Sequence, residues 1–351
     1  MPGDQRLPTR DRLLGLVEAM AGQPVAMLVD LVADLFITGT PKRISREAPV
    51  LILSYQGEKL VPGGGANAVA NVAALGGRPL PLGVVGDDAH GRGLLAALQS
   101  VGVETDGVLV RPGYRTPTKV RILGGGKHSI KQQIVRYDIE ETLELTRDER
   151  DRFAMALARW SAQSPVRAAI LSDYGYGAVE PDLLPRVRAA LGPGATLVCD
   201  SRYRLGEFAG LDGATPNEEE AEALFGAAIN DDPAVLERAG GGLLERLSAR
   251  FLLITRGSRG MSLFEPGGST HLPVHGTDQV ADVTGAGDTV IGTFALALAA
   301  GATPAEAALL ANYAGGVVVM KMGTATLTSD ELRHAVESDP RPIEEMRWER
   351  S

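Results

Sequence analysis

The chain has 351 residues, of which 44 % are apolar, 23 % are charged and 5 % are aromatic. This length fits two ordinary domains or one large domain with an elaboration, and the apolar fraction is too high for a disordered protein. No apolar run approaches the roughly 18–20 residues of a membrane span, and no apolar signal-peptide core is present. We therefore expect no integral membrane placement.

The charge and the cysteine count narrow the class further. The net charge is -9, from 44 acidic and 35 basic residues, which gives no general attraction to nucleic acid or to anionic membranes. The single cysteine, Cys199, argues against a disulfide framework and a multi-cysteine zinc site, and it fits a cytoplasmic location. The 43 glycines indicate tight turns where the backbone approaches something closely.

Short apolar runs rich in β-formers alternate with helical patterns along most of the chain. The predicted elements are, in order, strand Val25–Leu31, helix Ala66–Leu75, strand Leu80–Val85, helix Gly91–Ser100, strand Ala168–Leu171, helix Pro181–Leu191, strand Thr196–Cys199, helices Asn217–Phe225 and Pro233–Ala249, strands Phe251–Thr255 and Met261–Phe264, and helices Ala286–Ala300, Pro304–Met320 and Ser329–Val336. This alternation predicts an α/β fold, a doubly wound, mostly parallel sheet with helices on both faces.

Two stretches, residues 34–61 and 106–140, lack this alternation. They contain short apolar runs without helices between them, which predicts a small β-sheet lid beside the main sheet. Long surface loops are the alternative for these stretches. The last residues, Asp339–Ser351, combine two prolines with dense charge and are predicted to form a frayed tail.

The most informative segment is Ala281–Thr289, a glycine-rich turn that leads directly into an apolar helix. Such a turn presents unpaired backbone N–H groups at the positive end of the helix dipole, where they bind an anion. Asp288 lies in the first turn, beside that anion-binding point. A carboxylate there suits the role of general base toward a hydroxyl that attacks a phosphoryl group. The alternative makes Asp288 a capping residue and the glycines a plain turn.

Four motifs in the same order resemble those of the ribokinase-like (PfkB) carbohydrate kinases. They are Pro62–Asn67, Thr215–Glu220, Thr255–Gly260 and Asp282–Asp288. The resemblance covers residues 24–336 and implies a ribokinase-like kinase domain there, with lid elements from about 34–61 and 106–140. Residues 1–23 are then an N-terminal helical extension and residues 337–351 a C-terminal tail.

The resemblance implies an ATP-dependent sugar kinase and assigns roles to individual residues. Asp288 matches the base that deprotonates the sugar hydroxyl, and the backbone of Gly285, Ala286 and Gly287 matches the anion hole. Asn217 and Glu220 match residues that position Mg²⁺ with ATP, with water between the pair and the ion; a capped helix is the alternative for this pair. Asp282 and Thr284 match two ligands of a monovalent cation, which makes K⁺ activation an expectation.

The remaining matches divide into a nucleotide side and a sugar side. The nucleotide positions implied by the resemblance are Thr255, Gly257, Gly260, Asn312 and Gly323. On the sugar side, Gly63 and Gly64 match positions where the backbone approaches the sugar, and Asn67 and Asp34 match residues that bind its hydroxyls. Simple packing and C-capping are the alternative for Asn312 and Gly323, and an exposed turn is the alternative for Asp34.

Further strings resemble the branch of kinases that act on D-glycero-β-D-manno-heptose 7-phosphate, which are often fused to an adenylyltransferase. The strings are Arg43–Ser45, Glu47–Pro49, Thr118–Arg121, Leu171–Tyr174 and Lys321–Thr324. This branch phosphorylates the anomeric hydroxyl, and cations in the lid would clamp the distal phosphate. The substrate-side residues implied in this way are Arg43, Lys119, Arg121, Arg136 and Asp173; a solvated surface charge is the alternative for each cation.

Some features depart from that branch: Val29, Tyr176, Ser201 with Arg202, and the added stretch Gly124–His128. No fused adenylyltransferase is expected within the 351 residues. A PfkB kinase of a free sugar or nucleoside therefore stays open, as does a non-catalytic sugar or nucleotide sensor. An oxidoreductase is disfavoured because no Gly-x-Gly-x-x-Gly loop follows the first strand. Exposed lid strands predict a homodimer formed through the lid.

Overall fold

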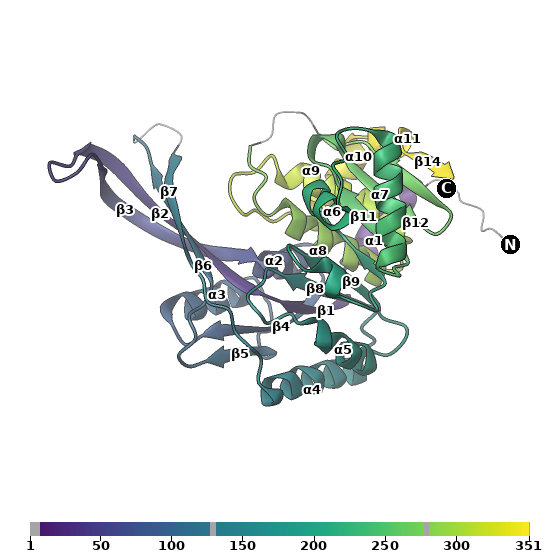
Figure 1. Cartoon of the computed structure of the whole chain (residues 1–351), viewed down its shortest axis with the longest axis horizontal. Helices are drawn as coiled ribbons and strands as arrows, with labels where there is room; N and C mark the ends of the chain where they lie inside the picture. The colour runs from purple at the N-terminus through teal and green to yellow at the C-terminus, as the bar shows by residue number, and fades with distance from the viewer. Residues whose placement is uncertain (1–7, 127–130, 277–280, 351) are drawn as a thin grey trace.

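The computed structural model describes residues 8–126, 131–276 and 281–350. Its described strands form a ten-stranded sheet, in the order β14-β13-β12-β11-β10-β9-β8-β1-β4-β5, and a separate four-stranded sheet (Figure 1). The strands of the large sheet are β1 (Pro24–Val29), β4 (Arg78–Gly86), β5 (Val108–Arg111), β8 (Ala168–Asp173), β9 (Thr196–Ser201), β10 (Gly213–Ala214), β11 (Phe251–Thr255), β12 (Met261–Glu265), β13 (Gly268–Leu272) and β14 (Arg347–Arg350).

The central strands of this sheet are parallel, and antiparallel pairing begins only at β12. β1 lies in parallel between β4 and β8, and every residue of β1 is buried, as its apolar sequence requires for a strand covered on both faces. β8, β9, β10 and β11 continue the parallel arrangement. The carboxyl ends of these strands therefore meet at one edge, where open α/β sheets bind ligands.

Helices cover both faces of the large sheet, and a separate apolar core lies on each face (Figure 1). The helices are α1 (Arg10–Ala19), α2 (Gly65–Ala74), α3 (Ala89–Ser100), α4 (Arg147–Gln163), α5 (Leu184–Leu191), α6 (Glu218–Phe225), α7 (Pro233–Arg246), α8 (Ala286–Ala299), α9 (Pro304–Val318), α10 (Ser329–Ser338) and α11 (Arg341–Glu344), with short 3-10 turns at Pro181–Leu183, Leu205–Glu207 and Gly257–Arg259. α8 is apolar nearly all round and is buried in the middle of its layer, which fixes the position of its N-terminus.

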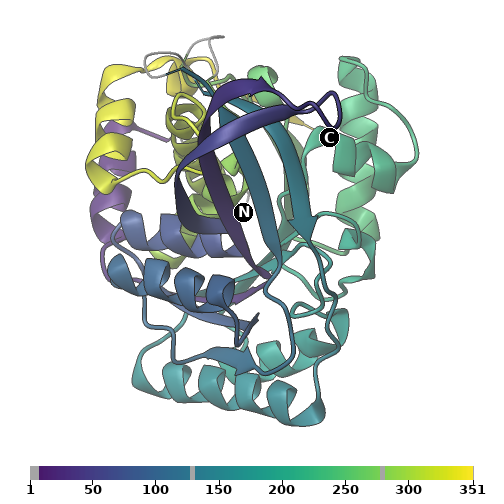
Figure 2. The ribbon, with the colours of Figure 1, turned by 90° about the vertical axis from the view of Figure 1, so that its left-hand side faces the viewer.

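The second sheet consists of β2 (Leu31–Ile44), β3 (Leu51–Gly64), β6 (Thr118–Gly124) and β7 (Gln132–Ile139), in the order β3-β2-β6-β7. It extends away from the body as a lid, and the end-on view shows its strands in front of the body (Figures 1 and 2). β2 pairs antiparallel with β3 and parallel with β6, and β6 pairs antiparallel with β7. The predicted fold class, with its small β-sheet lid, is thereby confirmed.

Part of the stretch predicted for the lid belongs to the main sheet instead. β5 pairs in parallel with Gly83–Gly86 of β4 and buries Val108 and Leu109. Pairing with β4 places Val108 and Leu109 against the core, whereas Val110 stays exposed at the edge of the sheet. The added stretch begins at Gly124, the last residue of β6; its residues Lys127 and His128 lie outside the described residues.

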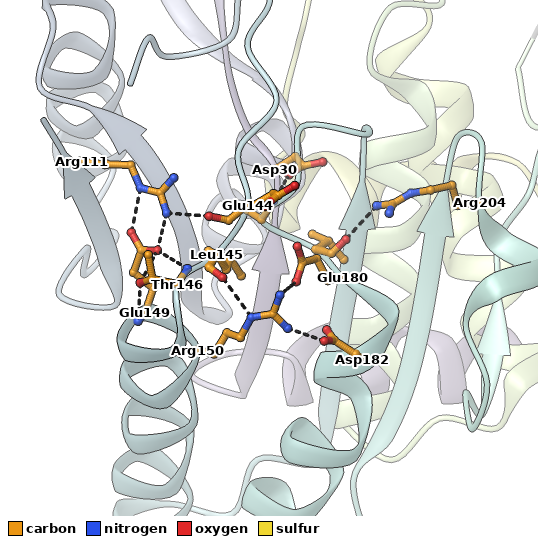
Figure 3. Close-up of polar contacts among 12 residues, drawn as sticks. Asp30, Arg111, Glu144, Leu145, Thr146, Glu149, Arg150, Glu180, Asp182 and Arg204 are labelled. Atoms are coloured by element: carbon orange, nitrogen blue, oxygen red, sulfur yellow. Dashed lines mark hydrogen bonds and ion pairs between the residues drawn. The ribbon is translucent and has the colours of Figure 1, made fainter. Parts of the chain in front are cut away.

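Helix α4 was not predicted from the sequence, because its exposed face is so charged that few apolar residues mark it. Phe153, Leu157 and Trp160 form its buried stripe. Its N-terminus has a capping box between Thr146 and Glu149, and Glu149 also pairs with Arg111 of β5 (Figure 3). Arg150, the residue after Glu149, pairs with Glu180 and Asp182, which attaches α4 to the segment after β8 (Figure 3).

The prediction of a frayed C-terminal tail is wrong for residues 339–350. They form α11 and the strand β14, which pairs antiparallel with β13. Asp339 anchors this segment, because its carboxylate accepts hydrogen bonds from Arg341 and pairs with His275. At the other end of the chain, α1 buries Leu13 and Leu16 in the main core. Among the described residues, no helix is long and apolar enough to cross a bilayer.

Candidate active site

The N-terminus of α8 points to the edge of the sheet where β8 and β9 end, and the base of the lid lies nearby. Gly285 is the N-cap of α8, with a left-handed φ of 80° and no side-chain capping bond. A Cβ on Gly285 would lie 2.5 Å from Nδ2 of Asn67, so the close approach of α2 requires glycine there. The first turn of α8 is therefore left open to bind an anion through its backbone N–H groups.

Asp288, in this first turn, is only 2 % exposed, yet its carboxylate has two hydrogen-bond donors. The Tyr174 hydroxyl donates to Oδ1 at 2.6 Å, and the Asn67 amide donates to Oδ2 at 3.1 Å. Burial raises the pKa of Asp288 to about 7, against the lowering effect of these two bonds. A carboxylate with such a pKa can take up a proton from a hydroxyl near neutral pH.

Asn67 is held in place by its neighbour one turn along α2. The Asn71 amide donates to the Asn67 carbonyl at 3.0 Å and to its Oδ1 at 3.3 Å. With Oδ1 occupied, the Nδ2 group of Asn67 is directed toward Asp288 and the Gly285 carbonyl. The predicted sugar-side residue Asn67 and the predicted base Asp288 are therefore in direct contact.

Asp34 lies on β2 at the base of the lid, and it is buried rather than exposed. Its carboxylate accepts a hydrogen bond from Arg121 on β6 at 2.6 Å and one from the Thr324 hydroxyl at 3.2 Å. A Cβ on Gly63 would lie 2.6 Å from Cγ of Asp34, so glycine is needed where β3 passes this carboxylate. Asp34 also raises the pKa of Asp288, which places the two carboxylates in the same electrostatic environment.

Lys119, on β6, lies between these groups. Its Nζ lies 5.3 Å from the centroid of the Tyr174 ring. Burial lowers the pKa of this lysine, and Asp34 and Asp288 partly restore it. Its positive charge therefore faces the two acidic groups that were predicted to act on the sugar.

A second acidic cluster lies at the ends of β9 and α6. Asn217 caps α6 in a reciprocal capping box with Glu220. It also forms a β-bridge with Thr255, so two predicted nucleotide-side residues are adjacent. Asp200 is half-buried, and desolvation together with the charges of Glu220 and Asp288 raises its pKa well above the usual value. Burial likewise raises the pKa of Glu220. The cluster therefore holds two half-buried carboxylates, and carboxylate oxygens are the donors that a divalent cation prefers.

Asp282 joins the loop before α8 to the segment after α9. Its carboxylate accepts hydrogen bonds from the backbone N–H groups of Thr284 at 2.9 Å and Gly323 at 3.0 Å. Burial raises the pKa of Asp282, but these bonds outweigh burial and leave its pKa below the usual value. The carboxylate therefore stays ionised, as a ligand of a monovalent cation must.

Other predicted site residues have different surroundings. Arg43 is exposed toward the outer end of the lid, and Arg136 pairs with Asp138 at 3.0 Å. The Asp173 carboxylate accepts hydrogen bonds from the Ser201 hydroxyl, the Arg204 guanidinium and the Gly175 N–H. Asn312 donates to the Pro273 carbonyl at 2.7 Å. Gly257 and Gly260 have left-handed φ angles in the turn after β11, where a Cβ on Gly260 would meet the Leu272 carbonyl.

Sequence reasoning did not assign roles to Tyr174, Asp200, Thr324 or Asp30, although the first three contribute to the geometry around Asp288 and Asp34. Tyr174 and Asp200 follow or end buried strands, which was the available signal. Nothing in the local sequence shows that either residue faces α8.

The comparisons with known proteins agree with this geometry. A family model described as pfkB family carbohydrate kinase matches residues 36–331. The chain belongs to this family. It is thus an ATP-dependent carbohydrate kinase by class, and the resemblance inferred from the four motifs is confirmed.

The pfkB chain is 38 % identical over 337 residues to the bifunctional protein HldE of Mesorhizobium japonicum and 39 % identical over 316 residues to that of Vibrio vulnificus strain YJ016. These matches cover 94 % and 89 % of this chain but only 65 % and 63 % of the two relatives. The fold is similar to ribokinase of Arabidopsis thaliana, complexed with ribose and ATP, with a TM-score of 0.70 at 21 % identity over 91 % of this chain and 100 % of that one. It is also similar to phosphofructokinase-2 of Escherichia coli, with a TM-score of 0.71 at 18 % identity over 90 % and 98 %.

Proposed function

We propose that this pfkB kinase transfers the γ-phosphate of ATP to the anomeric hydroxyl of a heptose 7-phosphate or a similar phosphosugar. The observation that carries the proposal is the buried Asp288 carboxylate, with a pKa of about 7, beside the open N-terminus of α8. The strings shared with the heptose-phosphate branch and the identity to the HldE proteins support the choice of acceptor.

In this proposal Asp288 removes the proton from the sugar hydroxyl, while Asn67 and Asp34 hold the sugar. The N–H groups of Gly285, Ala286 and Gly287 stabilise the charge that develops on the transferred phosphoryl group. Lys119 brings a positive charge to the same region from the lid. A lid over the sugar excludes water, which would otherwise compete as the acceptor.

The residues present also fit the expected ions. Asn217 and Glu220, with the half-buried Asp200, would hold Mg²⁺, which neutralises phosphate charge when bound. The raised pKa values of Asp200 and Glu220 are consistent with a site for a cation. Asp282 and Thr284 would hold K⁺. Thr255, Gly257, Gly260, Asn312 and Gly323 remain the proposed nucleotide side.

One observation favours the second candidate, a kinase of a free sugar. Arg121 and Arg136, proposed to clamp a distal phosphate, already pair with Asp34 and Asp138. Only Lys119 and Arg43 of the four proposed cations would then bind the distal phosphate, so less positive charge would face it. A non-catalytic sensor is disfavoured because it has no need for the Asp288 base.

The deciding experiment measures ADP release from ATP and Mg²⁺ with a panel of free sugars, nucleosides and sugar phosphates, with and without K⁺. We expect the highest turnover with D-glycero-β-D-manno-heptose 7-phosphate, and loss of about 10²–10⁴-fold in kcat for Asp288→Asn. Turnover confined to unphosphorylated acceptors would reject the phosphosugar and leave the kinase intact. Near-normal kcat of Asp288→Asn would remove Asp288 from the mechanism.

We also propose a homodimer formed through the lid and a cytoplasmic location, with the kinase domain at residues 24–336. The lid carries many of the exposed large apolar side chains of the described chain. They are Ile44, Val50, Leu51, Tyr55, Ile134, Val135 and Tyr137. Apolar side chains gathered on one small sheet favour pairing with a second copy.

A further inference from the structure

Tyr174 makes the shorter of the two hydrogen bonds to Asp288, yet it comes from a part of the chain far from both α8 and the lid. It directly follows β8, and its hydroxyl donates to Oδ1 of Asp288 at 2.6 Å, while Asn67 serves the other oxygen at 3.1 Å. Burial raises the pKa of Tyr174 well above its usual value, so its hydroxyl keeps its proton and remains a donor throughout the working pH range.

The segment that carries Tyr174 is attached to one buried carboxylate. Asp30, between β1 and β2, accepts backbone hydrogen bonds from Tyr174 at 2.8 Å, Tyr176 at 3.0 Å and Ala178 at 2.9 Å. Burial raises the pKa of Asp30 to about 6, which the same three bonds counteract. Burial of a carboxylate costs free energy unless hydrogen bonds compensate for it. Here the compensating bonds come from the backbone of residues 174–178, so Asp30 fixes the backbone of Tyr174.

The ring of Tyr174 is fixed as well as its backbone. Lys119 lies over the ring, and a Cβ on Gly64 would lie 3.3 Å from its Cε2 atom. Gly64 at the end of β3 and Lys119 of β6 therefore lie against the ring, and the Asp30 carboxylate holds the backbone of the same residue. They leave the hydroxyl of Tyr174 directed at Asp288.

We propose that Tyr174 is a positioning residue for phosphoryl transfer: it fixes the orientation of the Asp288 carboxylate and favours its ionised form, with Asp30 as the anchor of Tyr174. This inference rests on the proposed role of Asp288 as the base. The substrate proton then goes to Asp288 and not to Tyr174, which is already protonated.

The charges around Asp288 determine how strongly the Tyr174 hydroxyl affects its ionisation. The groups that face it are Asp34 from β2, Lys119 from β6, Asp200 from β9, Asn67 from α2 and Tyr174. Asp34 and Asp200 disfavour a further negative charge, and Lys119 favours one. Removal of the Tyr174 hydroxyl therefore shifts the balance toward protonated Asp288, which cannot act as a base.

The test compares Tyr174→Phe with Tyr176→Phe by ADP release at pH 5.5–9.5, using heptose 7-phosphate or the fastest acceptor of the panel. Tyr176 is a matched control because its hydroxyl donates to Glu140, not to Asp288. For Tyr174→Phe we expect the acidic limb of the kcat/KM profile to move up by about one pH unit. The rate should fall about tenfold below that limb and recover toward high pH, with kcat affected more than KM.

A loss of the same size at every pH, or an unchanged profile, would overturn the inference, because a merely structural tyrosine does not move the acidic limb. Asp30→Asn provides a second variant that keeps the ring and the hydroxyl; we expect its profile to move in the same direction. Asp288→Asn separates the two proposals. If that variant is inactive while both other variants keep the wild-type profile, the base stands and the positioning role fails.

Discussion

Replacement of Asp288 by asparagine should make the protein more stable at neutral and alkaline pH while it lowers kcat by about 10²–10⁴-fold. Burial raises the pKa of Asp288 from 3.8 to about 7. A carboxylic acid whose pKa is higher in the folded state favours folding below about pH 4, where it is protonated in both states. That contribution is lost as the pH rises through about 7. Asparagine is neutral throughout and shows no such loss.

The size of the effect follows from the shift of the pKa. A shift of about three units corresponds to about 4 kcal/mol at pH 8, because each unit corresponds to about 1.4 kcal/mol. Asparagine can keep both contacts, since its carbonyl accepts from Asn67 and the Tyr174 hydroxyl can accept from its amide. With an unfolding entropy of about 2.1 cal/mol/K per residue, the gain in Tm is about 5 °C.

Thermal melting of both proteins, followed by circular dichroism from pH 4 to pH 8.5, measures this difference. We expect nearly equal Tm values at pH 4 and a gap that widens up to about pH 7 and then stays constant. Titration of Asp30 occurs in both proteins and largely cancels in the comparison. A gap that is independent of pH, or a variant that is less stable at pH 8, would refute the assignment of a buried, desolvated carboxylate.

Two other predictions concern the lid. Asp34→Asn leaves the nearly buried Arg121 without its ionic partner and should destabilise the protein by about 3 kcal/mol in urea denaturation; Asp87→Asn, which breaks an exposed pair with Arg92, is the control and should change stability by less than about 1 kcal/mol. An unchanged urea midpoint for Asp34→Asn would contradict the buried pair. Val135→Asp should convert a dimer of the 36.9 kDa chain into a monomer in light scattering, whereas Met155→Asp on α4 should not. A monomeric wild-type protein would reject the dimer.

The parts of the fold with strong local signals could be predicted from the sequence. The central strands and α8 have continuous apolar runs that few other structures could bury, and the turn before α8 has glycines where a left-handed φ is needed. α4 was missed because its charged residues mask a narrow apolar stripe. β14 was missed because its stability comes from pairing with β13, about 80 residues earlier, rather than from its own sequence.

The candidate site likewise divides into residues that local motifs reveal and residues whose role depends on contacts distant in sequence. Asp288, Asn67 and Asp34 were predicted from motifs, and the structure brings them together. Tyr174 could not be given its role, since its contact with Asp288 spans 114 positions of sequence and depends on how β8 lies relative to α8. The capping box of Asn217 and Glu220 was foreseen as the alternative to a metal site, and its geometry is compatible with both roles.

The register of the lid places the two proposed roles of this small sheet, substrate binding and dimer contact, on opposite faces. In β6 and β7, Lys119 is opposite Asp138 and Arg121 is opposite Arg136, so these four charged side chains share one face, and Asp34 of β2 is paired with Lys119 on that face. Lys59 of β3 joins this face, because it is opposite Phe36, which is opposite Arg121; the four cations and two carboxylates leave an excess positive charge, which suits the proposed phosphorylated substrate.

The other face of the same strands carries Val120, Ile122, Val135 and Tyr137, because successive residues of a strand point to opposite sides. Val135 and Tyr137 are about half exposed there, and burial of such side chains would stabilise a contact with a second lid. A one-residue slip between β6 and β7 would exchange the faces of one strand and bring charges into the apolar side. The proposed dimer contact and the charge proposed to face the substrate therefore depend on the same register, so a substitution that shifts this register should affect both assembly and acceptor binding.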